Sequence, residues 1–156
     1  MPVLSEPLVA YRIHNRRFPQ LNGMGAAIMG GRWNSPGVFL VYACATFEGA
    51  ILERVVHFDN AGIPQDEYQL ITIPAGITVD ECSIGHHKIW DQNEFRTVDY
   101  GDGWIKSASS VALLVPGFPA RPYQTNVLIN PNHPDFSQLK VSPSASMAWD
   151  QRLTKR

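Results

Sequence analysis

The chain has 156 residues, of which 44% are hydrophobic and 17% charged, so it is long enough and apolar enough for one folded domain and is not intrinsically disordered. The net charge of −1, with Lys and Arg scattered along the chain, argues against nucleic-acid binding as the main activity. No run approaches the roughly 18 apolar residues of a membrane span, and the first residues lack a signal-peptide pattern. We therefore expect a soluble, cytoplasmic protein that binds neither nucleic acid nor membrane.

Five segments rich in β-branched, aromatic and other apolar residues predict strands, in chain order at 8–13, 38–42, 68–73, 111–115 and 126–130. The polar, glycine-rich segment 15–37 lies between the first two, and its length is typical of a segment that shapes a site or a lid. A polar tail follows residue 142, with Trp149 as its aromatic anchor. Because strands outnumber helices, the predicted fold class is α+β, a mixed α/β sheet domain.

A helix is predicted from a cap at Thr46 to about Phe58. Leu52 and Val56 widen its apolar stripe, so we expect this helix to be largely buried; the stripe itself consists of Phe47, Ile51, Val55 and Phe58. A short helix is predicted at 104–109. The two cysteines are too few for a disulfide framework, and Cys44, between apolar neighbours, is expected to be a core residue.

The segment Gly30–Gly37, with the sequence GGRWNSPG, presents an arginine in a turn. Two glycines before Arg32 allow a close backbone approach, and Pro36-Gly37 imposes a turn after it. Such a loop suits a guanidinium that grips a phosphate with two hydrogen bonds. The alternative is a surface turn with a salt-bridged Arg32.

Glu53 is a carboxylate in a mostly apolar helix, where it must be paired, protonated or functional. Gly49, one turn earlier, leaves space over which the Glu53 side chain leans, beside the end of the strand with Tyr42. We therefore expect a pocket that holds Tyr42 and Glu53 together. The alternative is a core ion pair of Glu53 with Arg12 or with neighbours of Arg54.

Other polar motifs are weaker. Gly23 and Gly25 fall short of a dinucleotide-binding fingerprint. His86 and His87 are adjacent and have no partner at metal-site spacing, so no metal site is predicted. Ser110 lacks the context of a hydrolase nucleophile.

Several of these motifs together resemble the RES-domain toxins of RES–Xre toxin–antitoxin pairs. The resemblance covers nearly the whole chain, and its most specific parts are GGRWNSPG at 30–37 and NVLINPNHPDF at 126–136. The other matching residues are Tyr11-Arg12, Gly25-Ala26, Tyr42, Glu53 and the segment 150–153. It implies a single RES domain over residues 1–156, with a compact fold like that of ADP-ribosyltransferases: a central split, mostly antiparallel β-sheet with flanking helices.

The resemblance also implies an activity, the degradation of NAD by release of nicotinamide, which would deplete the cell of NAD and arrest growth. Arg32, Tyr42 and Glu53 are then the catalytic residues, and Arg12, Ser110 and Asn126 bind NAD. Glu53 would stabilise the cationic ribose, Tyr42 would stack on nicotinamide or ribose, and Arg32 with Arg12 would hold the diphosphate. One departure is Gly117, which stands after Val115-Pro116 where the family usually has serine; Ser110 is the nearby hydroxyl.

NAD is a substrate in this interpretation, so no cofactor is expected, and inorganic phosphate is a candidate co-substrate. The acceptor of ADP-ribose is open between water, phosphate and a protein side chain. The implied partners are an Xre-type helix-turn-helix antitoxin and a second copy of the chain. Two alternatives stay open: transfer of ADP-ribose to a host protein, and a binding module weakened at Gly117. An RNA-cleaving toxin is opposed by the near-neutral charge.

Overall fold

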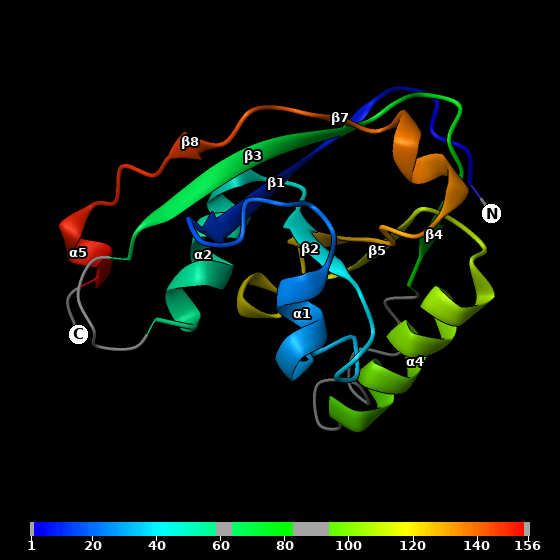
Figure 1. The fold of residues 1–156 in the computed structure, drawn as a ribbon, viewed down its shortest axis with the longest axis horizontal. Coiled ribbons are helices and arrows are strands. Elements are labelled where there is room, and N and C mark those ends of the chain that lie inside the picture. The colour runs from blue at the N-terminus through cyan, green and yellow to red at the C-terminus, as the bar shows by residue number, and fades with distance from the viewer. Residues whose placement is uncertain (1, 59–63, 83–93, 155–156) are drawn as a thin grey trace.

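The computed structural model describes residues 2–58, 64–82 and 94–154, and its centre is a twisted sheet of eight strands (Figure 1). The strands run in the order β4-β5-β6-β2-β1-β3-β7, with β8 also paired to β3. Among the strand pairs of the described residues, only β4 and β5 are parallel; the other pairs are antiparallel. Their bounds are β1 Leu8–Asn15, β2 Val41–Cys44, β3 Asp66–Ile73, β4 Val79–Glu81, β5 Ala112–Pro116, β6 Thr125–Ile129, β7 Lys140–Val141 and β8 Ala145–Ser146.

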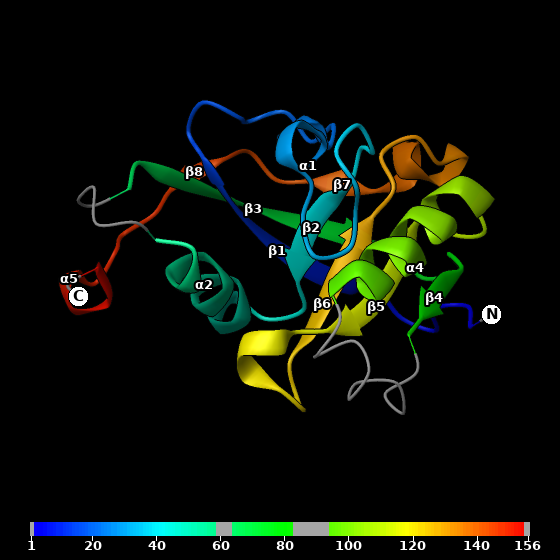
Figure 2. The ribbon, with the colours of Figure 1, turned by 90° about the horizontal axis from the view of Figure 1, so that it is seen from below.

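Helices flank this sheet. Figures 1 and 2 place α2 beside β1 and α4 beside β4 and β5. The α-helices are α1 Met24–Met29, α2 Phe47–Val56, α4 Glu94–Ser107 and α5 Gln151–Thr154, and the 3-10 segments are η2 Phe118–Ala120 and η3 Pro134–Gln138. None of the described helices is both long and apolar enough to cross a membrane.

The sheet comes close to dividing between β1 and β2. These two strands are joined through Tyr11 and Cys44, whereas β1 pairs with β3 over its full length. The predicted mixed α/β class, with a mostly antiparallel, split sheet and flanking helices, is therefore confirmed. The division matters for the site because β2 and β6 turn one face toward α2 and the Gly30–Gly37 loop.

Each face of the sheet buries its own hydrophobic cluster, because neighbouring residues of a strand point to opposite faces. The first cluster lies on the face of Ala10 and includes Val41, Ala43, Ile71, Ile73, Val127 and Ile129. The second lies on the face of Tyr42 and includes Trp33, Leu40, Trp104, Leu113, Val115 and Leu128. Trp33 thus packs the centre of the Gly30–Gly37 loop, which we call the arginine loop, against β5 and β6.

All five predicted strands exist, with shifted ends. The segment 38–42 enters the ladder only at Val41, because the backbone N–H and C=O of Val38 bond to Ser35 and Asn34 instead. The sequence did not predict α1, whose glycine lowers helix propensity, or the short strands β4, β7 and β8. Helix α4 begins ten residues before the predicted start at 104.

The cap of α2 is confirmed: Thr46 Oγ1 accepts a hydrogen bond from the Gly49 N–H at 3.0 Å. The expectation that this helix is largely buried is wrong, since Leu52 and Val56 are 36% and 46% exposed. The helix covers the sheet with one face only, so the residues that widen the stripe lie beyond the contact. Cys44 is buried, as expected of a core residue.

Candidate active site

Glu53 meets Asn126 across the space between α2 and β6. The Asn126 Nδ2 group donates a hydrogen bond of 2.9 Å to Glu53 Oε1. The alternative of a core ion pair is wrong within the described residues, because Arg54 pairs with Asp66 at 2.7 Å and Arg12 bonds to Gln69. The carboxylate of Glu53 is therefore held in place by Asn126, and no cation of the described part of the chain pairs with it.

Asn126 lies on the sheet face that also presents Tyr42. Asn126 pairs with Cys44 on β2, and Tyr42 stands two residues earlier on the same strand and hence on the same face. The Asn126 side chain is 8% exposed, and its Oδ1 atom is buried without a hydrogen-bond partner in the described structure. Buried polar atoms are nearly always paired, so this acceptor points to a missing donor.

The Arg32 loop is shaped by its two leading glycines and by Tyr42. Gly30 has a φ of 77°, a left-handed conformation that glycine adopts without strain. A Cβ atom on Gly31 would lie 2.7 Å from the Tyr42 hydroxyl, so only glycine lets that hydroxyl reach the loop. The sequence predicted that the two glycines allow another group to come close to the loop backbone, and that group is the Tyr42 hydroxyl.

Both hydrogen-bonding capacities of the Tyr42 hydroxyl are used within this loop. It donates to Asn34 Oδ1 at 2.6 Å and accepts from the Trp33 N–H at 3.0 Å. Burial, more than any nearby charge, raises the pKa of Tyr42 well above its ordinary value, so the hydroxyl stays protonated. Tyr42 therefore positions the loop through its hydroxyl. The sequence predicted only a stacking role for its ring.

Helix α4 clamps the same loop from the other side. Thr97 Oγ1 donates to the Arg32 carbonyl at 2.5 Å, and Asp102 accepts from the backbone N–H and the hydroxyl of Ser35 at 2.9 and 2.5 Å. Gly101 has no side chain to block the carbonyl of Trp33, which any Cβ atom there would overlap. The loop that bears Arg32 is therefore fixed at several points.

The Arg32 guanidinium lies 4.1 Å from the centre of the Phe118 ring. None of its N–H groups has an acceptor among the described residues, so the alternative of a salt-bridged turn is wrong there. Phe118 follows Gly117, where a Cβ atom would lie 2.9 Å from Asn126 Oδ1. Contacts thus form an arc that runs from Arg32 through Phe118, Gly117 and Asn126 to Glu53. The charge of Arg32 lowers the pKa of Tyr42 and the charge of Glu53 raises it.

Two predicted binding residues lie elsewhere. Arg12 leaves β1 on the opposite face from Tyr11, which contacts Phe47 of α2, and it bonds to Gln69 at 2.8 Å and to the Phe18 carbonyl at 3.0 Å. Burial lowers the pKa of Arg12 to about 10, so it remains charged at neutral pH. The structure thus gives Arg12 a role in holding the chain at Phe18 and does not bring it to Arg32.

Ser110 is 1% exposed and precedes β5 at the end remote from Asn126. Its hydroxyl accepts from Trp104 Nε1 at 3.0 Å and lies 2.7 Å from Asp80 Oδ2 and 2.8 Å from the Ala112 carbonyl. The structure therefore does not place Ser110 with the other candidates, and it does not supply the hydroxyl that Gly117 lacks.

The space expected to be empty above Gly49 is filled. The carboxamide of Gln124 lies against Gly49, and its Cγ lies against Gly117. Thr46 Oγ1 donates to Gln124 Oε1 at 3.0 Å, and Gln124 Nε2 donates to the Thr125 carbonyl at 2.8 Å. Sequence reasoning missed Gln124 because nothing along the chain indicates that residue 124 returns to the start of α2.

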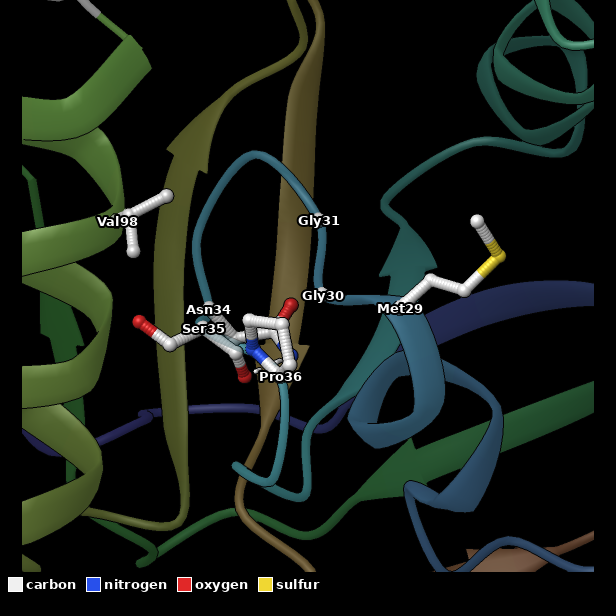
Figure 3. Close-up of a pocket in the computed structure, with 7 residues that line it drawn as sticks. All are labelled: Met29, Gly30, Gly31, Asn34, Ser35, Pro36 and Val98. Carbon is white, nitrogen blue, oxygen red and sulfur yellow. Dashed lines mark hydrogen bonds between the residues drawn. The ribbon is translucent and has the colours of Figure 1, made fainter.

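A pocket of about 290 Å³ lies against the Gly30–Gly37 loop, and Figure 3 shows the residues that line it. Its lining comes from the end of α1, the loop and Val98 of α4, and includes none of Arg32, Tyr42 and Glu53. No group of three or more His, Cys, Asp or Glu side chains comes together as metal ligands within the described residues. His86 and His87 lie outside those residues.

A model of the RES domain matches residues 9–150, which is most of the chain. The chain belongs to the RES-domain family. Its relatives include the Prs ADP-ribosylating toxin of Sphingobium sp. (strain YBL2), 34% identical over 87% of this chain and 88% of the relative. Another is Toxin Res of Yersinia enterocolitica, 32% identical over 94% of this chain and 99% of the relative.

The fold of this RES domain is similar to that in the crystal structure of the M. tuberculosis MbcT–MbcA toxin–antitoxin complex. The TM-score is 0.72, with 15% sequence identity over 93% of this chain and 86% of that chain. At this level of identity the likeness concerns the fold alone.

The RES domain also contains site residues that the sequence did not single out. Asn34 lies inside the GGRWNSPG motif, and its Nδ2 group bonds to the carbonyls of Ala26 and Val38 at 3.0 Å each, so the motif itself was the available signal. Thr97 and Asp102 gave no signal, because their contacts exist only once α4 packs on the loop.

Proposed function

We propose that this RES-domain protein is the toxin of a bacterial toxin–antitoxin pair and that it cleaves the bond between nicotinamide and ribose in NAD. The observation that supports this most directly is the arc with the Glu53–Asn126 pair at one end and the Arg32 guanidinium at the other. A held carboxylate suits a cationic ribose, and a guanidinium whose N–H groups find no acceptor among the described residues suits a diphosphate.

The chemistry needs few groups because nicotinamide is already cationic on the sugar. When the bond breaks, its electron pair goes to the ring nitrogen, which becomes neutral, and the positive charge develops on the ribose. No acid is needed for the leaving group, whereas ordinary glycosidases use two carboxylates because their leaving oxygen requires a proton. Glu53 stabilises the developing charge and accepts a hydrogen bond from the 2′-hydroxyl.

Asn126 and Tyr42 act through other residues in this proposal. Asn126 fixes one oxygen of Glu53, so the carboxylate keeps its direction as the charge develops. Tyr42, with Asn34, fixes the loop that presents Arg32. Arg32 takes the diphosphate without the help of Arg12, which bonds elsewhere.

The test is nicotinamide release from NAD, followed by chromatography. Glu53→Gln preserves size and can still accept the hydrogen bond from Asn126, but it removes the charge, and we expect it to lower the rate by about 10²–10³, as for loss of one positioned electrostatic group. Glu48→Gln is the matched control, because Glu48 is exposed on the first turn of the same helix. Equal release by wild type and the folded Glu53→Gln variant would refute the role of Glu53.

A second candidate is transfer of ADP-ribose to a protein, favoured by the name of the Sphingobium relative, an ADP-ribosylating toxin. The reaction products distinguish NAD cleavage from transfer of ADP-ribose to a protein. Water as acceptor gives free ADP-ribose, inorganic phosphate gives its phosphate ester, and a protein side chain gives an added mass on that protein. Intact NAD after prolonged incubation with folded protein would instead favour a non-catalytic binding module.

The partners are part of the same proposal. The names of the relatives and the toxin–antitoxin complex support a cognate antitoxin, for which we propose the Xre type, and we propose a homodimer for the toxin itself. Expression of the wild type is expected to arrest bacterial growth, whereas Glu53→Gln is tolerated. Co-expression with a candidate Xre-type antitoxin and measurement of the mass of the purified complex test both partners.

A further inference from the structure

A narrow slot beside the Glu53–Asn126 pair is filled by the side chain of Gln124. Two glycines form its walls: a Cβ atom on Gly49 would overlap the Gln124 carboxamide, and a Cβ atom on Gly117 would overlap its stem. Both glycines are buried. A slot whose walls lack side chains accepts a flat group.

The polar groups at the end of this slot match a primary carboxamide. Thr46 Oγ1 donates to the Gln124 oxygen at 3.0 Å, and the Thr125 carbonyl accepts from the Gln124 nitrogen at 2.8 Å. A carboxylate in the same place has no proton to give to the Thr125 carbonyl. The end of the slot therefore distinguishes an amide from an acid.

A second observation points to a ligand in this space. Asn126 Oδ1 is buried and unpartnered within the described chain, and it lies 2.9 Å from the Cβ position of Gly117, beside the stem of Gln124. The Asn126 side chain is 8% exposed and its Nδ2 group is committed to Glu53, so the amide cannot turn to satisfy the oxygen. A donor on a molecule that enters where the Gln124 stem now lies would satisfy this oxygen.

We propose that the slot between Gly49 and Gly117 binds a primary carboxamide, that Gln124 occupies it in the ligand-free protein, and that the substrate's carboxamide displaces Gln124. This inference rests on the proposed function, in which the substrate carries nicotinamide. The order along the slot is Gly49, Gly117 and then Asn126 with Glu53. It corresponds to carboxamide, ring and ribose of a nicotinamide nucleotide, with the reacting bond at Glu53.

The experiment compares the binding of three small molecules by calorimetry and needs no turnover. Nicotinamide and benzamide carry the carboxamide, whereas nicotinic acid carries a carboxylate on the same ring as nicotinamide. Both amides are expected to bind Gln124→Ala about tenfold more tightly than wild type, the factor expected if the slot of the wild type is open about one time in ten. Nicotinic acid is expected to bind neither protein measurably.

Gln138→Ala is the matched control, since Gln138 is an exposed glutamine that bonds to Asp135. It should bind all three molecules as the wild type does. The side-chain amide signal of Gln124, recognised by its absence from the spectrum of Gln124→Ala, gives a readout on the wild type itself. It is expected to shift toward the position of a solvent-exposed amide as nicotinamide is added.

Equal or weaker amide binding by Gln124→Ala, equal binding of nicotinic acid, or an unmoved Gln124 signal would each overturn the inference. Nicotinamide release from NAD is measured separately on the same wild-type protein. Release without the expected binding pattern means that the slot is wrong and the proposed function stands. The binding pattern without release means that the slot is right and the proposed reaction is wrong.

Discussion

Asn126 on β6 donates a hydrogen bond of 2.9 Å to Glu53 on α2, and its own oxygen is left buried without a partner in the described structure. The two residues are 73 positions apart in the chain, so only the packing of α2 against the sheet brings them together. This pair links the fold to the proposed chemistry, because it fixes a carboxylate on the sheet face that also presents Tyr42.

Asn126→Asp is expected to lower the rate of nicotinamide release by about tenfold to a hundredfold, because a hydrogen bond to a charged group is worth about 1.5–3 kcal/mol. The new carboxylate also repels Glu53 instead of donating to it. Asn130→Asp is the control, because Asn130 follows the last residue of β6. Its side-chain oxygen accepts a hydrogen bond from the Asn132 backbone N–H, and an aspartate keeps that acceptor. If the two variants release nicotinamide equally fast, Asn126 does not position Glu53.

Tyr42→Phe is expected to reduce the free energy of unfolding by about 1–3 kcal/mol, since it removes the hydrogen bond that the Tyr42 hydroxyl donates to Asn34 Oδ1 and the one that it accepts from the Trp33 N–H. A looser Arg32 loop should raise KM for NAD more than it lowers kcat. Denaturant unfolding and steady-state kinetics measure both effects. Tyr123→Phe, at a position 93% exposed, should change neither.

Gly117→Ser is expected to destabilise the protein by about 1–3 kcal/mol, because the new side chain overlaps the stem of Gln124. Gly117 has φ −85° and ψ 98°, which any residue adopts, so the cost lies in the contact and not in the backbone. The loss should therefore be recovered largely when Gln124→Ala is combined with it. A double-mutant cycle with no coupling between the two positions would contradict this account.

Cys44 and Cys82 are expected to resist an aromatic disulfide reagent at pH 8 until the protein unfolds. Both thiols are buried, and burial raises the pKa of each to about 12. The folded pKa lies above the unfolded value of 9.0, so their contribution to stability is complete below pH 9 and is lost as the pH rises toward 12. Denaturant unfolding between pH 8 and 11 should show this decline, and Cys44→Ala combined with Cys82→Ala should reduce it. Rapid labelling of the native protein would contradict the burial.

Local patterns in the sequence were enough for the strands, the Thr46 cap and the arginine loop. These features depend on nearby residues, such as β-branched runs, a capping side chain or glycines beside Arg32, and the structure keeps them with small shifts at the ends. The candidates Arg32, Tyr42 and Glu53 came from the same kind of signal. Their functional roles remain predictions that the experiments above address.

What the sequence by itself determined is therefore the mixed sheet domain, its RES-domain membership and three candidate site residues, Arg32, Tyr42 and Glu53. The tertiary structure alone decided which groups serve them: Asn126 for Glu53, α4 for the loop and Gln124 for the space above Gly49. It also separated Arg12 and Ser110 from the site. The physical reason is that these contacts join residues far apart in the chain, and a hydrogen bond between such residues leaves no periodicity or spacing in the sequence.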